Sequence, residues 1–167
     1  AVVLTLALLV AFSCAPPAEE EVAPLEVEKT IKVGALLTMT GPIASWIGPG
    51  GPGIQDYFRY VNEELGGIEY KDPATGKTEK VKVELMWGDH GWDIARTISL
   101  YERFKAAGMQ FVMCHGSVPT TGVMGLASKD KIAGMPSNCT FEPSMYLMED
   151  PYIVANVDSM PEAAGAT

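Results

Sequence analysis

The feature that most constrains the fold is an alternation of short apolar runs with helical stripes, which begins at Thr30. Residues 31–37 form a mostly apolar run with the length of a strand that is buried on both faces. A helix is then predicted by apolar side chains three or four residues apart, at Ile54, Phe58, Val61 and Leu65. Because these two patterns keep alternating along the chain, the sequence predicts an α/β fold, with a doubly wound parallel sheet covered by helices on both faces.

The other elements of this alternation follow in order. Residues 81–87 alternate apolar and polar side chains, which predicts a strand with one drier face near a sheet edge. Asp93 is placed to cap a helix whose apolar stripe is Ile94, Ile98, Tyr101 and Phe104. Further strands are predicted over 110–114, 132–135 and 152–157, and further helices over 119–131 and from 161 onward.

The N-terminal segment has the composition of an export signal. Residues 1–12 are almost wholly apolar, a run too short to span a bilayer as a mature helix. Residues 11–14 (AFSC) resemble a bacterial lipobox, in which Cys14 becomes the lipidated first residue, although Ala11 stands where Leu is usual. We therefore expect residues 1–14 to be a signal with a lipobox, truncated at its start. The protein would be lipid-anchored in the periplasm or at the cell surface. An ordinary cleaved signal is the alternative.

Composition divides the rest of the chain in two. Residues 15–29 are rich in Pro, Glu and Ala, which predicts a tether that cannot bury enough apolar surface to fold. Residues 30–167 are expected to form the folded lobe. The net charge is −9 and no basic stripe is present, which argues against nucleic-acid binding. Cys114 and Cys139 could form a disulfide in an oxidising compartment or remain two buried thiols, and the sequence leaves both open.

The loops after the predicted strands hold the candidate functional residues. In a doubly wound sheet, ligands bind beyond the carboxyl ends of the strands, where the strand order reverses. The loops after residues 37, 114 and 135 carry Ser and Thr beside a helix start or turn, where backbone N–H groups collect. Hydroxyl and N–H groups suit a carboxylate or another small anion. Ordinary helix capping is the alternative interpretation of these hydroxyl residues.

The same loops carry a family resemblance. The segments concerned are residues 31–42 (IKVGALLTMTGP), 61–63 (VNE), 66–68 (GGI), the acidic pair Asp89 and Asp93, the Ser/Thr loop after residue 114, and residues 136–140 (PSNCT). In this order and behind a lipobox, they resemble the type I periplasmic binding proteins of the branched-chain amino acid transport class. The resemblance covers residues 31 to about 160.

The resemblance implies a non-enzymatic binding protein with two α/β lobes that close on a ligand, without a cofactor or a metal ion. Its first lobe would hold the carboxylate of an amino acid through the loops after the third and fourth strands, with an aromatic side chain after the first strand. The matching residues are Trp46, Ser117, Val118, Ser137, Asn138 and Thr140. The implied partners are a small-molecule ligand such as an amino acid, an ABC permease and, through the lipid, the membrane, with no nucleic acid.

Several positions depart from the family pattern. Pro119, Ile94 and the pair Asn138–Cys139 stand where other residue types are common, and aligning Thr140 requires an insertion. A bulky Trp46 together with a polar Asn138 favours a ligand smaller or more polar than leucine. Since family members are well over twice as long as this chain, we interpret it as an N-terminal fragment that lacks the second lobe.

Two other functions fit parts of the sequence. The ectodomain of a ligand-sensing receptor would share this lobe. A metal-dependent enzyme would require the candidate ligands at the strand ends to converge, although none has the usual close spacing: Asp89, His90, Cys114, His115 and Cys139. Residues 48–53 (GPGGPG) fit the dinucleotide pattern G-x-G-x-x-G but lie too far after the first strand to form that site.

Overall fold

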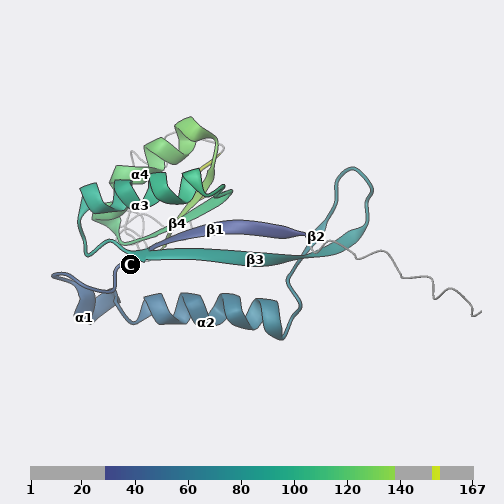
Figure 1. The fold of residues 1–167 in the computed structure, drawn as a ribbon, viewed down its shortest axis with the longest axis horizontal. Coiled ribbons are helices and arrows are strands. Elements are labelled where there is room, and N and C mark those ends of the chain that lie inside the picture. The colour runs from purple at the N-terminus through teal and green to yellow at the C-terminus, as the bar shows by residue number, and fades with distance from the viewer. Residues whose placement is uncertain (1–28, 138–151, 155–167) are drawn as a thin grey trace, which may run out of the picture.

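The computed structural model describes residues 29–137 and 152–154, and it has the predicted α/β fold (Figure 1). Its strands are β1 (Thr30–Leu37), β2 (Ile68–Lys71), β3 (Thr78–Asp89), β4 (Phe111–His115) and β5 (Ala133–Ser137). Its helices are α1 (Ala44–Ile47), α2 (Gly50–Glu63), α3 (Ile94–Ala106) and α4 (Ser117–Asp130).

The strands form one mixed sheet in the order β2-β3-β1-β4-β5. β1 pairs in parallel with β3 and β4, and β4 pairs in parallel with β5. Figure 1 shows α2 on one face of the sheet and α3 and α4 on the other. The doubly wound arrangement is therefore confirmed for the described part of the chain.

The apolar run of β1 is buried on both faces, as predicted. Leu36 packs into a core with Tyr101 and Phe104 of α3 and with residues of α4. Its neighbours Ala35 and Leu37 pack into a second core with Phe58 of α2. Because successive side chains of a strand point to opposite faces, one apolar run supplies both cores.

The antiparallel strand β2 is not predicted by the sequence pattern. Ile68–Lys71 pairs with Thr78–Val81 of β3 in a hairpin. The turn between them is held by the carboxylate of Asp72, which accepts hydrogen bonds from the Ala74 N–H and the Thr75 hydroxyl. The strand itself has no recognisable sequence pattern because it is short and half polar. It becomes a strand only through its backbone hydrogen bonds to β3.

The outer edge of β3 is only partly covered by β2, which agrees with the predicted position near a sheet edge. Beyond Val81 the side chain of Asn62 takes over: its amide N–H donates to the Val83 carbonyl at 2.7 Å, and its amide oxygen accepts from the Val83 N–H at 2.8 Å. Gly67 passes so close to β3 that a Cβ there would lie 2.6 Å from the Val81 carbonyl oxygen. The family-like segments 61–63 and 66–68 therefore contain residues that hold the edge of β3.

Other element boundaries differ slightly from the prediction. Asp93 caps α3 as predicted, since its carboxylate accepts from the Arg96 N–H. Ile94, however, lies outside the core with 40% of its surface exposed, and Leu100 is buried instead. α2 ends at Glu63, before Leu65. Of the predicted fifth strand, Ile153 forms an isolated parallel bridge to Gly134. The remainder of that strand and the predicted final helix lie outside the described residues.

Candidate functional site

The candidate site lies at the carboxyl edge of the sheet, where the chain leaves neighbouring strands in opposite directions. After β1 the chain enters α1 and α2 on one face, and after β4 it enters α4 on the other face (Figure 1). β1 and β4 are adjacent in the sheet. This divergence is the topological switch point at which doubly wound folds bind their ligands.

The first turn of α4 offers backbone N–H groups at this point. The first N–H groups of a helix have no partner inside the helix, and Gly116, the N-cap, supplies no side-chain hydrogen bond to them. Ser117 and Val118 are the first two helical residues, and Pro119 has no N–H. These N–H groups, together with the positive end of the helix dipole, can bind a carboxylate.

Three of the predicted site residues lie together there. Ser117 and Val118 begin α4, and 42% of the Val118 surface is exposed. Ser137 ends β5, directly opposite His115 in the ladder, and its carbonyl accepts the Gly116 N–H at 3.0 Å. Its hydroxyl lies 3.4 Å from the Cys114 carbonyl oxygen. The start of α4 and the end of β5 therefore lie side by side at this edge of the sheet.

The other predicted residues are less defined by the fold. Trp46 lies in α1, in the loop after β1, and 80% of its surface is exposed. Such exposure would let its ring meet a ligand or another part of the protein. Asn138, Thr140, Cys139 and Cys14 lie outside the described residues. The possible disulfide between Cys114 and Cys139 is thus untested, and Cys114 is buried in the core between the sheet and α3.

Asp89, at the end of β3, binds the β1–α1 loop. One carboxylate oxygen accepts from the N–H groups of Met39 at 2.8 Å and Thr40 at 3.2 Å, and also from the Gly91 N–H at 3.0 Å. The other oxygen accepts the Thr40 hydroxyl. Burial by itself would raise the pKa of Asp89, but the Thr40 hydroxyl and the three backbone N–H groups outweigh it and lower the pKa to about 2. The carboxylate thus fastens two loops together.

His90 connects the β3–α3 turn to the end of β4. It is fully buried, and its Nδ1 accepts the Trp92 N–H at 3.1 Å. The proton therefore resides on Nε2, which donates to the His115 carbonyl at 3.0 Å. The Thr38 hydroxyl donates to the same carbonyl at 2.9 Å. Burial lowers the pKa of His90, which keeps the ring neutral.

These contacts give a structural role to Asp89 and His90, two of the residues considered as metal ligands in the sequence. Asp89 and His90 use their side chains to hold loops. Across residues 29–137 and 152–154, no group of three or more His, Cys, Asp or Glu side chains converges as a metal site. The same residues contain no helix long and apolar enough to cross a membrane. The sequence pattern does not predict that these side chains hold loops together. Their position at the end of a strand is the one feature of the sequence that points to such a role.

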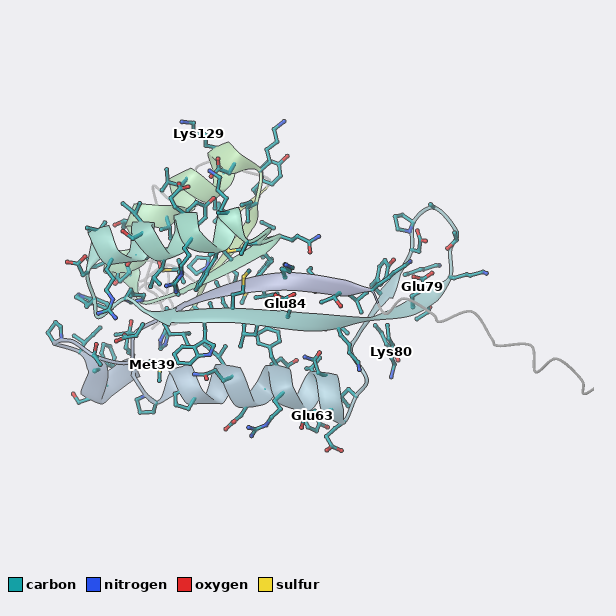
Figure 2. The ribbon with its side chains drawn as sticks, viewed as in Figure 1. Met39, Glu63, Glu79, Lys80, Glu84 and Lys129 are labelled. Carbon is teal, nitrogen blue, oxygen red and sulfur yellow. The ribbon has the colours of Figure 1, made fainter. Side chains whose placement is uncertain are left out.

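A hollow lies away from this edge of the sheet. It has a volume of about 410 Å³ and is lined by Tyr57, Val61, Glu64, Leu65, Gly67, Ile68, Glu69 and Lys80. Figure 2 shows Glu63 and the β3 residue Lys80 near one end of α2, and Met39 near the other end. Because Met39 follows β1 at the carboxyl edge, this open hollow is at the wrong end of the sheet for the switch-point site.

Comparison with known proteins agrees with this architecture. The family described as periplasmic binding protein matches residues 30–160. Among solved structures, a substrate-binding protein of an ABC transporter from Aeropyrum pernix shares 22% identity at a TM-score of 0.68, over 82% of this chain and 33% of that one. No curated protein matches the sequence significantly.

Two further solved structures differ in what they bind. The branched-chain amino acid binding protein LivJ of Streptococcus pneumoniae, in complex with isoleucine, shares 20% identity at a TM-score of 0.63, over 78% of this chain and 34% of that one. A solute-binding protein from Rhodopseudomonas palustris, in complex with 3,4-dihydroxy benzoic acid, shares 22% identity at a TM-score of 0.56, over 77% and 32%. The chain thus spans about a third of the length of these structures.

Proposed function

Because this chain belongs to the periplasmic binding protein family, we propose that it supplies the first lobe of an extracytoplasmic substrate-binding protein of an ABC importer. A second lobe would complete the protein, and closure of both lobes on a ligand would present the loaded form to the permease. Ligand binding would shift the open–closed equilibrium because the ligand touches both lobes only in the closed form. The predicted lipid on Cys14 and the tether of residues 15–29 would keep the protein beside its transporter.

We propose that the ligand is a branched-chain amino acid or a related small amino acid or amide. The observation that carries this proposal is the first turn of α4, where Gly116 leaves the N–H groups of Ser117 and Val118 without a side-chain cap. A ligand carboxylate would accept these hydrogen bonds at the positive end of the helix. The Ser117 hydroxyl would add a third donor, and the exposed ring of Trp46 would line the pocket.

The proposal is tested by two substitutions at one position in the complete protein. Ser117→Ala removes the hydroxyl alone, whereas Ser117→Pro removes the hydroxyl and the N–H. Proline is tolerated at the first residue of a helix, and the Gly116 ψ of 146° suits a following proline. We expect the Ala variant to weaken amino acid binding by about tenfold or more, and the Pro variant by a further tenfold or more, at roughly 1.5–3 kcal/mol per hydrogen bond to a charged carboxylate.

The matched control is Ser99→Ala, an exposed serine on α3 whose hydroxyl bonds only its own helix, at the Ala95 carbonyl. Isothermal titration calorimetry with L-leucine, L-isoleucine and L-valine gives the affinities, and circular dichroism checks that each variant is folded. Affinities unchanged by Ser117→Pro in a folded protein would refute the assignment of the ligand carboxylate to α4.

A further inference from the structure

We propose that Trp92 is a positioning residue for the ligand-binding turn: its ring holds the β4–α4 turn so that the first N–H groups of α4 face the ligand. This inference rests on the proposed function of that turn. It assigns a role to a residue that contributes no group to the predicted ligand-binding set.

The Trp92 ring lies directly against Gly116. A Cβ built on Gly116 would be 2.3 Å from ring atom Cζ3 and 3.1 Å from Cη2, so only glycine fits beneath the ring. Gly116 also has φ 103° and ψ 146°, a conformation essentially restricted to glycine. The ring therefore covers the residue that sets the direction in which α4 begins.

The backbone of Trp92 is held in an unfavourable conformation to place the ring there. Its φ is 64°, in the left-handed region, which is unusual for a bulky residue. The surrounding turn fixes this geometry: the Trp92 N–H donates to His90 Nδ1 at 3.1 Å, and the Asp93 N–H donates to the His90 carbonyl at 3.0 Å. Strained residues persist only where their surroundings fix them, and they cluster at functional sites.

His90 adds a second contact from the same turn. Its Nε2 donates to the His115 carbonyl, one residue before Gly116. The β3–α3 turn thus holds residue 115 by a hydrogen bond and residue 116 by ring contact, immediately before Ser117. Holding a binding loop in its bound conformation raises affinity because less conformational entropy is lost when the ligand binds.

The experiment compares Trp92→Ala, Trp92→Phe and the control Trp87→Ala in the complete protein. Trp87 is a matched control because it is a tryptophan near the end of β3, the strand that leads into the turn of Trp92, and 45% of its surface is exposed. Two quantities are measured: the affinity for L-leucine, L-isoleucine and L-valine, and the hydrogen exchange rate of the Gly116 N–H in the ligand-free protein. This N–H donates to the Ser137 carbonyl across the turn and so reports on its order.

We expect Trp92→Ala to speed Gly116 exchange by about tenfold or more and to weaken binding by a similar factor, since both follow from a loosened turn. Trp92→Phe, which keeps a flat ring, should recover most of both losses, and Trp87→Ala should change neither. Unchanged Gly116 exchange in folded Trp92→Ala overturns the inference. If that variant fails to fold, Trp92→Leu replaces it, because it keeps apolar volume without a flat ring.

The two proposals fail in different ways. If none of the three amino acids binds the unaltered protein, the ligand is not one of these three, whereas the exchange measurement still shows whether Trp92 orders the turn. If the amino acids bind and Trp92→Ala changes exchange without changing affinity, the ring has a structural role only, and the inference is overturned.

Discussion

Replacement of Asp89 by asparagine tests how the loops around the candidate site are held together. The carboxylate accepts three backbone N–H groups and one hydroxyl, which bind the β1–α1 loop to the β3–α3 turn. An asparagine side chain is isosteric with aspartate but carries no charge. Its amide oxygen can keep the three N–H hydrogen bonds, and its NH₂ then faces the Thr40 hydroxyl, which has to accept instead of donate. The Asp89→Asn change therefore removes the charge without creating a cavity.

The expected cost follows from the pKa. The Asp89 pKa is lowered from 3.8 to about 2, because the hydrogen bonds to the ionised form outweigh burial. One pKa unit corresponds to about 1.4 kcal/mol, so the ionised form contributes about 2 kcal/mol to stability at pH 7. The side chain is 16% exposed, so solvent screening reduces this only modestly. Because asparagine can keep neutral hydrogen bonds to the same groups, we expect Asp89→Asn to destabilise the protein by roughly 1–3 kcal/mol.

The sign of the pH dependence is fixed by the lowered pKa. A group whose pKa is lower in the folded state stabilises the fold fully above its unfolded-state pKa, and this stabilisation is lost as the pH falls through the folded-state pKa. Between pH 7 and pH 3 the unaltered protein should therefore lose about 1 kcal/mol from Asp89 alone. The difference between the two proteins should shrink by the same amount.

Urea unfolding at pH 7 and pH 3 measures both quantities, provided that the slope of the unfolding free energy against urea is unchanged. Asp56→Asn is the matched control, because Asp56 is exposed and pairs only with Arg59 on the same helix, where about 0.5 kcal/mol or less is expected. A loss below about 1 kcal/mol at pH 7, or a difference independent of pH, would refute this account of the loops.

Three further predictions concern other parts of the chain. Asn62→Ala should cost about 1–3 kcal/mol in urea unfolding, because it removes both hydrogen bonds to Val83 at the edge of β3, whereas the exposed neighbour Glu63→Ala should cost about 0.5 kcal/mol or less. Gly67→Ala should destabilise by several kcal/mol, or prevent folding, since a Cβ would lie 2.6 Å from the Val81 carbonyl oxygen at a φ of +117°; a cost under about 1 kcal/mol would contradict the close approach. Cys14→Ala should release the protein from the membrane in cell fractionation, because the lipid is its proposed anchor, and continued membrane association would contradict lipidation.

Much of the fold could be predicted because its signals are local. The apolar run over 31–37 and the apolar stripe of α2 each show which side chains are buried between the sheet and its helices. Asp93 caps α3 by a hydrogen bond within the first turn of that helix. β2 could not be predicted in this way, since Ile68–Lys71 becomes a strand only through its partner Thr78–Val81. Ile94 matches the helical stripe, but its position at the first turn leaves it exposed beyond the core.

The candidate site was only partly predictable. Ser117, Val118 and Ser137 lie at one edge as predicted, because parallel strands end together. The contact of Trp92 with Gly116 joins two loops that are far apart in sequence, and it depends on a left-handed Trp92 backbone that no local pattern of residue types indicates. Gly116, three residues before the helix predicted over 119–131, was the one available signal.

Calorimetry with matched ligand pairs shows whether the start of α4 binds a ligand carboxylate. The complete protein is titrated with L-leucine, L-isoleucine and L-valine and with the amide of each, in which the carboxylate is replaced by a neutral group. We expect saturable binding of at least one acid, and binding of its amide weaker by about tenfold or more, since hydrogen bonds to a charged group contribute roughly 1.5–3 kcal/mol. Equal affinity for an acid and its amide would contradict carboxylate binding by α4, and no binding of any of the three acids would contradict a branched-chain amino acid as the ligand.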